Sequence, residues 1–138
     1  MDTNVFLDLI VENCGKRFEE SKDFLDRARK GHFKIVTSNL VLAEVVWVLQ
    51  SFYKMDRVDI AKAVRSLLNI AGLKFLNKDD WKSALTHFVN KKVKYIDAVI
   101  ASIEGVSDHK VIVVSYDLEF DKLGVKRMEP REINKNPA

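Results

Sequence analysis

Apolar residues recur along this chain in short blocks whose spacing switches between that of a helix face and that of a buried strand. From Ile60 the apolar positions fall at i, i+1, i+4, i+7, i+8 and i+11, which is the spacing of one side of a helix. Val111–Val114 is a run of β-branched residues, as expected of a central parallel strand. The whole pattern predicts helices at residues 3–12, 17–30, 39–52, 57–71, 81–88 and 96–104, and strands at 34–37, 73–76, 111–114 and 124–128.

Cap residues and glycines mark the ends of several predicted helices. Ser38, Asp56 and Asp79 each precede a helix, and their side chains can accept a hydrogen bond from its first turn. Gly31 and Gly72 follow helices and suit their C-terminal ends. The side chains expected to face inward from the helix after Asp79 are those of Trp81, Ala84, Leu85 and Phe88.

Strands separated by helices indicate an α/β protein, and we expect a three-layer α/β/α sandwich around a parallel sheet. We expect a single domain over residues 1–133 and a frayed tail over residues 134–138, which contain Pro137. Ligands of such sheets bind beyond the carboxyl ends of the strands. Asp117 lies just past a predicted strand end, so the functional site is expected there.

Composition narrows the class of protein. The chain has 138 residues, of which 47% are hydrophobic and 31% charged, as in a soluble globular domain. No apolar stretch has the length of a membrane span, no signal peptide is visible, and a single cysteine excludes an internal disulfide. We therefore expect a cytoplasmic protein without a membrane partner. The net charge of +3 and the pI of about 8.9 permit nucleic-acid binding.

Four carboxylates occupy positions where a charge is hard to explain structurally. Glu44 is the only polar residue of a long apolar run, and Asp97 interrupts a second one. Asp2 opens the first apolar segment, and Asp117 ends the β-branched run. An unpaired buried carboxylate costs several kcal/mol, so four of them suggest one acidic pocket that binds a cation. An all-oxygen ligand set favours a hard cation such as Mg²⁺ or Mn²⁺.

These carboxylates lie within four short motifs that resemble those of PIN domains. The motifs are Asp2–Val5, Leu42–Val45 with Ser38 ahead of it, Asp97–Ala101, and Ser115–Asp117 followed by Phe120. They occur in the family's order and cover nearly the whole chain. Single-domain bacterial and archaeal members are mostly VapC-type toxins of toxin–antitoxin pairs. The resemblance implies a five-stranded parallel sheet, a metal-dependent endoribonuclease, an RNA substrate and a cognate antitoxin.

The resemblance also implies roles for the acidic residues. Asp2, Glu44, Asp97 and Asp117 fall on the acidic positions of the family. Asp2, Asp97 and Asp117 are the expected direct ligands of Mg²⁺ or Mn²⁺. Glu44 is either a further ligand or a base that orients the attacking water.

Other polar residues are expected around this cluster. Those that fall on supporting positions are Thr3, Asn4, Ser115 and, as an extra acidic residue of some members, Asp121. Lys91, Lys92 and Lys94 lie just before Asp97. They are either solvated charges at a helix end or residues that bind the RNA phosphates.

Each acidic residue also has a purely structural explanation. Asp2, Asp97 and Asp117 can cap a helix N-terminus, and Glu44 can lie on an exposed strip of its helix. The chain departs from the family at its start, where members have several apolar residues ahead of the first Asp and only Met1 precedes Asp2 here. Either the true start lies upstream or the first strand is severely shortened.

Two other functions stay open. A catalytically silent PIN domain would bind RNA or a protein partner. An Asp-nucleophile phosphatase of the haloacid dehalogenase type would need an Asp-x-Asp pair, whereas this chain has Asp2, Thr3 and Asn4.

One helix carries more apolar surface than a single sheet face requires. The residues of this face are Val41, Val45, Val48 and Phe52. We expect part of the face to form a contact between the subunits of a homodimer.

Overall fold

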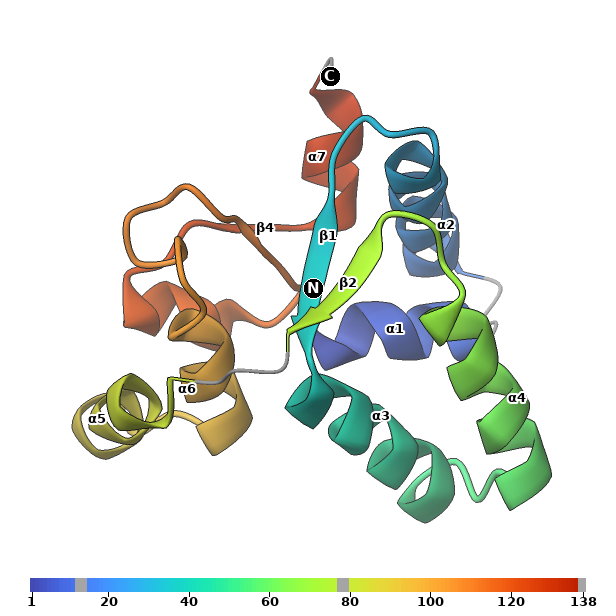
Figure 1. Ribbon diagram of the computed structural model, residues 1–138, viewed down its shortest axis with the longest axis horizontal. Helices are drawn as coiled ribbons and strands as arrows, with labels where there is room; N and C mark the ends of the chain where they lie inside the picture. The colour runs from blue at the N-terminus through green and yellow to red at the C-terminus, as the bar shows by residue number, and fades with distance from the viewer. Residues whose placement is uncertain (12–14, 77–79, 137–138) are drawn as a thin grey trace.

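The computed structural model describes residues 1–11, 15–76 and 80–136, in which helices and strands alternate along most of the chain (Figure 1). The helices are α1 (Thr3–Ile10), α2 (Lys16–Arg29), α3 (Asn39–Ser51), α4 (Arg57–Leu68), α5 (Trp81–Lys91), α6 (Tyr95–Ala101), the 3₁₀ helix η1 (Leu118–Leu123) and α7 (Pro130–Lys135). The strands are β1 (Ile35–Ser38), β2 (Leu73–Leu76), β3 (Val113–Val114) and β4 (Arg127–Met128).

The strands form two parallel pairs. Ile35 of β1 lies opposite Leu73 of β2, and Val113 of β3 lies opposite Arg127 of β4. Gly72 makes the turn into β2 at a φ of +85°. A Cβ atom at this position would lie 2.9 Å from the carbonyl oxygen of Ala28 in α2. This turn therefore requires glycine.

The backbone of Met1 and Asp2 joins the two pairs. The Met1 ammonium donates to the Val36 carbonyl of β1 at 2.9 Å, and the Asp2 N–H donates to the Val114 carbonyl of β3 at 3.0 Å. The order across the sheet is therefore β2, β1, Met1–Asp2, β3, β4. Met1 and Asp2 therefore occupy the place of the first strand.

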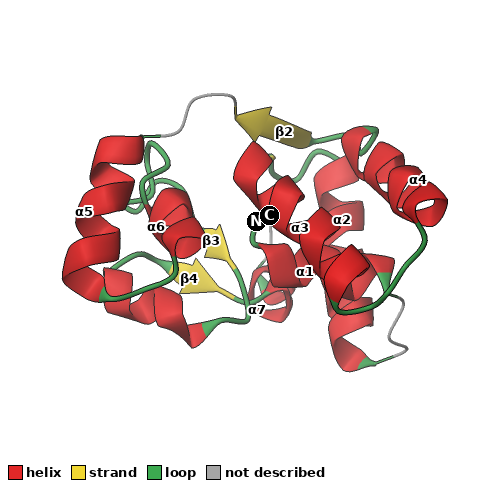
Figure 2. Cartoon of the chain, turned by 90° about the horizontal axis from the view of Figure 1, so that it is seen from below, coloured by secondary structure: helices red, strands yellow, loops and turns green. Residues whose placement is uncertain are grey.

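Helices cover both faces of the strands. Seen from below, α5 and α6 lie on one side of the strands, and α1, α2, α3 and α4 lie on the other (Figure 2). The predicted three-layer α/β/α sandwich is thus confirmed. Fully buried side chains fill the space between the layers, and the largest are Phe24, Phe120, Leu49, Val5, Val41, Val45 and Val99. No helix among the described residues is long and apolar enough to cross a membrane.

Two of the predicted caps are present. Ser38 accepts from the Leu40 N–H at 3.1 Å at the start of α3, and Asp56 accepts from the N–H of Val58 at 3.0 Å at the start of α4. The third predicted cap, Asp79, lies outside the described residues. Asp80 caps α5 instead, where its carboxylate accepts from the Ser83 N–H at 3.1 Å.

Several side chains expected in the core are on the surface. Leu85 and Phe88 of α5 are 44% and 45% exposed, so the prediction that these two side chains face inward was wrong. Ala84 is the fully buried residue of the predicted face, and the Phe88 ring meets the edge of Tyr95 instead. Leu68, the last residue of α4, is 53% exposed, whereas Ile60 and Leu67 of the same helix are buried.

The C-terminal segment is ordered further than predicted. Residues Asn134 and Lys135, which were assigned to a frayed tail, belong to α7. The side-chain amide of Asn134 donates to the Glu20 carbonyl at 2.9 Å, and Arg27 donates to the carbonyl of Ile133 at 2.7 Å. These bonds attach α7 to α2, so the prediction that Asn134 and Lys135 belong to a frayed tail was wrong.

An apolar cavity of about 410 Å³ lies between β1 and β3, beside the short first strand. Its lining includes Met1, Phe33, Ile35, Val36, Ile112, Val113 and Val114. The Ile35 N–H donates to the Gly72 carbonyl, on the β2 side of β1. Backbone groups of successive strand residues point to opposite sides, so those of Val36 point toward the cavity. The cavity therefore has apolar walls, and the Val36 carbonyl on this side of β1 accepts from the Met1 ammonium.

Candidate active site

Ser115 holds Asp2 at the carboxyl end of β3. Its hydroxyl donates to Asp2 Oδ2 at 2.6 Å, and it accepts from Asn4 Nδ2 at 3.1 Å and from the Asp117 N–H at 2.9 Å. A serine hydroxyl offers one donor and two acceptor positions, so all of its capacity is used. Asp2 Oδ1 also accepts from the Thr3 N–H at 2.7 Å, where it caps α1.

Glu44 reaches the same site from α3. The Thr3 hydroxyl donates to Glu44 Oε2 at 2.5 Å, which links the first turn of α1 to the second turn of α3. Glu44 is half-buried, whereas Trp47, three residues later, is 65% exposed. The Thr3 bond turns the carboxylate toward α1, so Glu44 does not lie on a purely solvated strip.

Asp97 is the most buried acid of the cluster. It lies in the first turn of α6 and is 3% exposed, and within the described residues its Oδ2 has no hydrogen-bond partner. Burial, together with the charges of Asp2, Asp117 and Glu44, raises its pKa from 3.8 to about 7, while the charge of Lys94 opposes the rise. The residue at the cap position of α6 is Lys94, so the alternative that Asp97 is a helix cap was wrong.

Asp117 completes the cluster from the segment after β3. Its carboxylate caps η1 by accepting from the Glu119 N–H at 2.9 Å. Its charge acts on Asp97, which shows that the two side chains share one electrostatic environment. Asp117 and Asp2 are thus both helix caps and members of the acidic cluster, so the structural and functional explanations do not compete for them.

Asp121 lies to one side of this cluster. It is exposed and pairs with Arg127 of β4, with 3.0 Å between Oδ1 and Nε. Arg127 Nη1 donates to the Ser115 carbonyl at 3.0 Å. Asp121 therefore acts on the site through Arg127. No local pattern indicates this role for Arg127, because it is the parallel pairing of β3 and β4 that brings Arg127 to Ser115.

The donor set fits a divalent cation. Four carboxylates from four elements lie within electrostatic reach of one another, and Asp97 Oδ2 is buried without a partner in the described part of the chain. Among the described residues, no group of three or more acidic, His or Cys side chains already converges at metal-ligand spacing. Small rotations of the carboxylates would therefore be needed to close around an ion.

The three lysines predicted to bind RNA are exposed at the junction of α5 and α6. Lys91 ends α5, Lys92 adopts the left-handed conformation at a φ of 52°, and Lys94 begins α6. The charge of Lys94 reaches Asp97. The lysines are therefore close to the acidic cluster on its α6 side.

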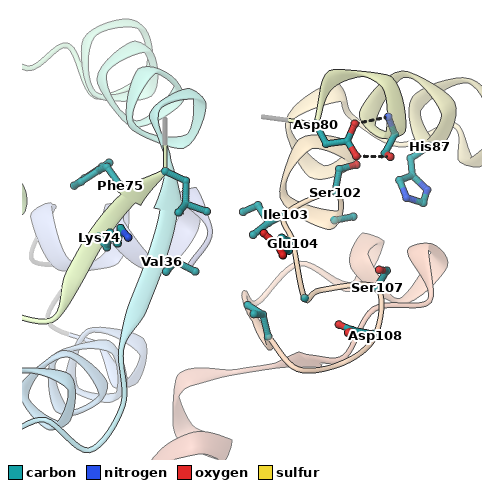
Figure 3. Close-up of a pocket in the computed structure, with 15 residues that line it drawn as sticks. Val36, Lys74, Phe75, Asp80, His87, Ser102, Ile103, Glu104, Ser107 and Asp108 are labelled. Carbon is teal, nitrogen blue, oxygen red and sulfur yellow. Dashed lines mark hydrogen bonds between the residues drawn. The ribbon is translucent and has the colours of Figure 1, made fainter. Parts of the chain in front are cut away.

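A separate cavity of about 1010 Å³ opens between β2 and the α5–α6 layer (Figure 3). Its labelled lining carries both signs of charge, from Lys74, Asp80, Glu104 and Asp108. None of the four clustered carboxylates is among the described residues that line it. Val36 borders this cavity and the smaller apolar one, so both open beside β1.

The predicted apolar face of α3 is divided between core and surface. Val41 and Val45 are fully buried, whereas Phe52 is 75% exposed. Trp47 and Tyr53 add exposed aromatic surface nearby. Part of the face is therefore free to contact a second protein, and the homodimer stays a prediction.

The chain is similar to known proteins over nearly all of its length. The profile of the family described as "PIN domain" matches residues 1–126. A VapC ribonuclease of Aquifex aeolicus (strain VF5) is 28% identical over 135 residues, which cover 96% of either chain. All of the clustered carboxylates lie inside the range that the family profile matches.

Proposed function

Because this chain belongs to the PIN domain family, we propose that it is an endoribonuclease that hydrolyses RNA phosphodiester bonds with Mg²⁺ or Mn²⁺. The observation that carries this proposal is the cluster of Asp2, Glu44, Asp97 and Asp117, in which Asp97 is buried with an unpartnered oxygen. Such a cluster is costly unless a cation neutralises it. Similarity to a VapC ribonuclease supports RNA as the substrate.

Hydrolysis adds a water oxygen to the phosphorus and breaks the bond to the leaving ribose oxygen. Asp2, Asp97 and Asp117 would hold the cation, which supplies positive charge for the phosphate and lowers the pKa of water. Ser115 fixes the orientation of Asp2 by its 2.6 Å bond. Thr3 fixes one oxygen of Glu44, which leaves the other free to orient the water or to bind the cation.

The experiment that tests this function is cleavage of single-stranded RNA by the purified chain. We expect cleavage with Mn²⁺ or Mg²⁺, none with excess chelator, and recovery when the metal is restored. Ca²⁺ is a useful comparison because it accepts longer bonds and looser geometry. Cleavage that persists undiminished in chelator would contradict the metal-dependent mechanism.

The second candidate is a catalytically silent PIN domain that binds RNA or a protein. The absence of a closed three-ligand group among the described residues favours it. RNA binding without cleavage under every metal condition would establish this alternative. The haloacid-dehalogenase-type phosphatase is not supported, because the chain belongs to a different family.

Lys91, Lys92 and Lys94 are proposed to bind the RNA backbone beside the acidic cluster. Replacing all three with Gln should weaken RNA binding and flatten its salt dependence by up to about 0.7 in the log–log slope per lost phosphate contact. Cation binding should persist because the ligands are untouched. Fluorescence anisotropy at several salt concentrations measures both quantities.

The matched control replaces Lys22, Lys30 and Lys62, which are exposed on α2 and α4. Its charge change is identical, so a general loss of positive charge would weaken both variants alike. Equal salt slopes for the two triple variants would show that the lysines before α6 are only solvated charges.

A protein partner is the last part of the proposal. The exposed Trp47 and Phe52 give the end of α3 an apolar surface of the kind that protein interfaces bury. We propose that a cognate antitoxin or a second copy of the chain covers it. The cytoplasmic location stays a prediction.

A further inference from the structure

An arginine stacks on an aromatic ring next to the acidic cluster. Arg17, in the first turn of α2, places its guanidinium carbon 4.4 Å from the centre of the Tyr116 ring. Tyr116 lies between Ser115 and Asp117 in the chain, and its N–H points at Asn4 Oδ1 at 3.5 Å. The stacked pair is therefore built on the same segment that positions the carboxylates.

Among the residues that the structure describes, the Arg17 guanidinium contacts the Tyr116 ring and makes no hydrogen bond or ion pair. Arg27 and Arg127 are used differently, since Arg27 donates to carbonyls of the C-terminal segment and Arg127 binds Asp121 and the Ser115 carbonyl. Arg17 is exposed, so a ligand can reach its guanidinium, whose plane the ring helps to orient.

The aromatic platform is itself held in place. The Tyr116 hydroxyl donates to Glu20 Oε2 at 3.1 Å, one helical turn after Arg17 on α2. Burial raises the pKa of Tyr116 to about 12, so the ring stays neutral and keeps its phenolic proton. A guanidinium above a neutral ring is attracted to its face, which limits the conformations that Arg17 adopts.

The charge of Arg17 also reaches α1. Burial raises the pKa of Asp8, and the Arg17 charge opposes that rise. Asp8 lies four residues after Asn4, about 6 Å along the helix axis. Arg17 therefore lies beside the acidic cluster, displaced along α1 and away from Asp2, and on the other side of the site from the lysines that precede α6.

We propose that Arg17, supported by Tyr116, binds a non-scissile phosphate of the RNA substrate on this side of the acidic cluster. The proposal rests on the ribonuclease function above. A cluster of carboxylates repels the RNA backbone, so the strand needs cations on the surfaces that flank it. A planar guanidinium with free parallel N–H groups binds a phosphate through two oxygens, which a lysine cannot do.

The test compares Arg17→Gln, Arg17→Lys and Arg29→Gln with the wild type. Arg29 is the control, because it is exposed on the same helix and pairs only with Asp26. The probe is a fluorescein-labelled single-stranded RNA of mixed sequence, titrated in chelator over a range of salt. Arg17→Gln should raise the Kd about tenfold and reduce the salt slope by about 0.7. Arg17→Lys should fall between it and the wild type.

Single-turnover cleavage with saturating RNA and Mn²⁺ supplies a second reading. Arg17→Gln should change the rate at saturation by less than about threefold, because the bound phosphate is not the one attacked. If the wild-type protein binds RNA but does not cleave it, the proposed ribonuclease function is wrong. The comparison of Kd values still tests the role of Arg17 in that case. If Arg17→Gln binds RNA with the same Kd and salt slope as Arg29→Gln, the proposal is wrong.

Discussion

Asp97→Asn should melt at a higher temperature than the wild type at pH 8 without divalent cations, and should cleave RNA at least about a hundredfold more slowly. The loss of activity follows from removing an expected ligand, since even groups that only orient ligands are worth 10- to 100-fold. The gain in stability follows from the pKa of Asp97, which burial and its acidic neighbours raise from 3.8 to about 7. The variant removes a charge that the fold holds at a cost.

The sign of the pH dependence can be stated from the same pKa. Between about pH 4 and pH 7 the folded protein keeps the Asp97 proton, whereas the unfolded chain has lost it. The folded state binds more protons in this range, so the contribution of Asp97 to stability falls as the pH rises. The full difference of about three pKa units corresponds to at most about 4 kcal/mol.

Urea unfolding at several pH values, with and without Mn²⁺, measures this effect. Asp23→Asn is the matched control, because Asp23 is exposed on α2 and far along the chain from the cluster. Wild type should gain stability from Mn²⁺, and Asp97→Asn should gain much less. Identical pH and Mn²⁺ responses of the two variants would mean that the acidic cluster does not bind a cation.

Adding three apolar residues, for example Val-Ile-Val, ahead of Met1 should raise the melting temperature by about 5–10 °C. Such a segment would extend the two-residue first strand into the cavity of about 410 Å³ between β1 and β3. Each apolar side chain buried contributes about 1.5–3 kcal/mol, less roughly 1–2 kcal/mol for ordering its backbone. A net gain of a few kcal/mol corresponds to the expected shift.

The extension also removes a buried positive charge. Burial lowers the pKa of the Met1 ammonium from 8.0 to about 6, and the Asp2 charge opposes this. The folded state binds fewer protons between about pH 6 and pH 8, so the cost of this group is full below pH 6 and is lost above pH 8. An amide bond at Met1 abolishes that dependence.

A Ser-Gly-Ser extension of the same length separates the two contributions. It also converts the ammonium to an amide, but it brings no apolar side chains into the cavity. We expect the polar extension to stabilise the protein only below about pH 8, and the apolar one to stabilise it at every pH. Equal melting temperatures for both extensions at pH 8.5 would show that the cavity does not accept a strand.

Local signals predicted much of the fold. Ser38 and Asp56 cap the helices that they were expected to cap, and the apolar spacing placed α2, α3 and β2 within a residue or so of their observed bounds. The sequence also contains a signal for α7, since Glu129 directly precedes Pro130 and its capping-box partner Glu132 lies three residues later. Local patterns could not predict which side of α5 would be covered, because the spacing of Leu85 and Phe88 suits a core face and yet both side chains are exposed.

The acidic cluster could be predicted from the sequence, because charged residues are rare in a core. The hydrogen bonds that hold the cluster together could be seen only in the folded structure. Asp97 and Glu44 interrupt apolar runs, and such interruptions are visible in a sequence. The bond between Thr3 and Glu44 joins residues 41 positions apart, and that between Ser115 and Asp2 joins residues 113 positions apart. Arg17 and Arg127 have no unusual local sequence, so only the packing of α2 on the β3 segment and the pairing of β4 reveal their contacts.

The fully used hydroxyl of Ser115 distinguishes the two buried acids of the cluster. Two N–H groups already occupy its acceptor positions, so its hydrogen must point to Asp2 Oδ2. Asp2 Oδ1 accepts from the Thr3 N–H as well, and both bonds favour the ionised form of Asp2. Burial raises the pKa of Asp2 and of Asp97, but these hydrogen bonds oppose the rise at Asp2, whereas no described residue donates to Asp97 Oδ2. An incoming cation therefore meets one carboxylate that hydrogen bonds already orient and another, at Asp97, whose second oxygen no described residue holds.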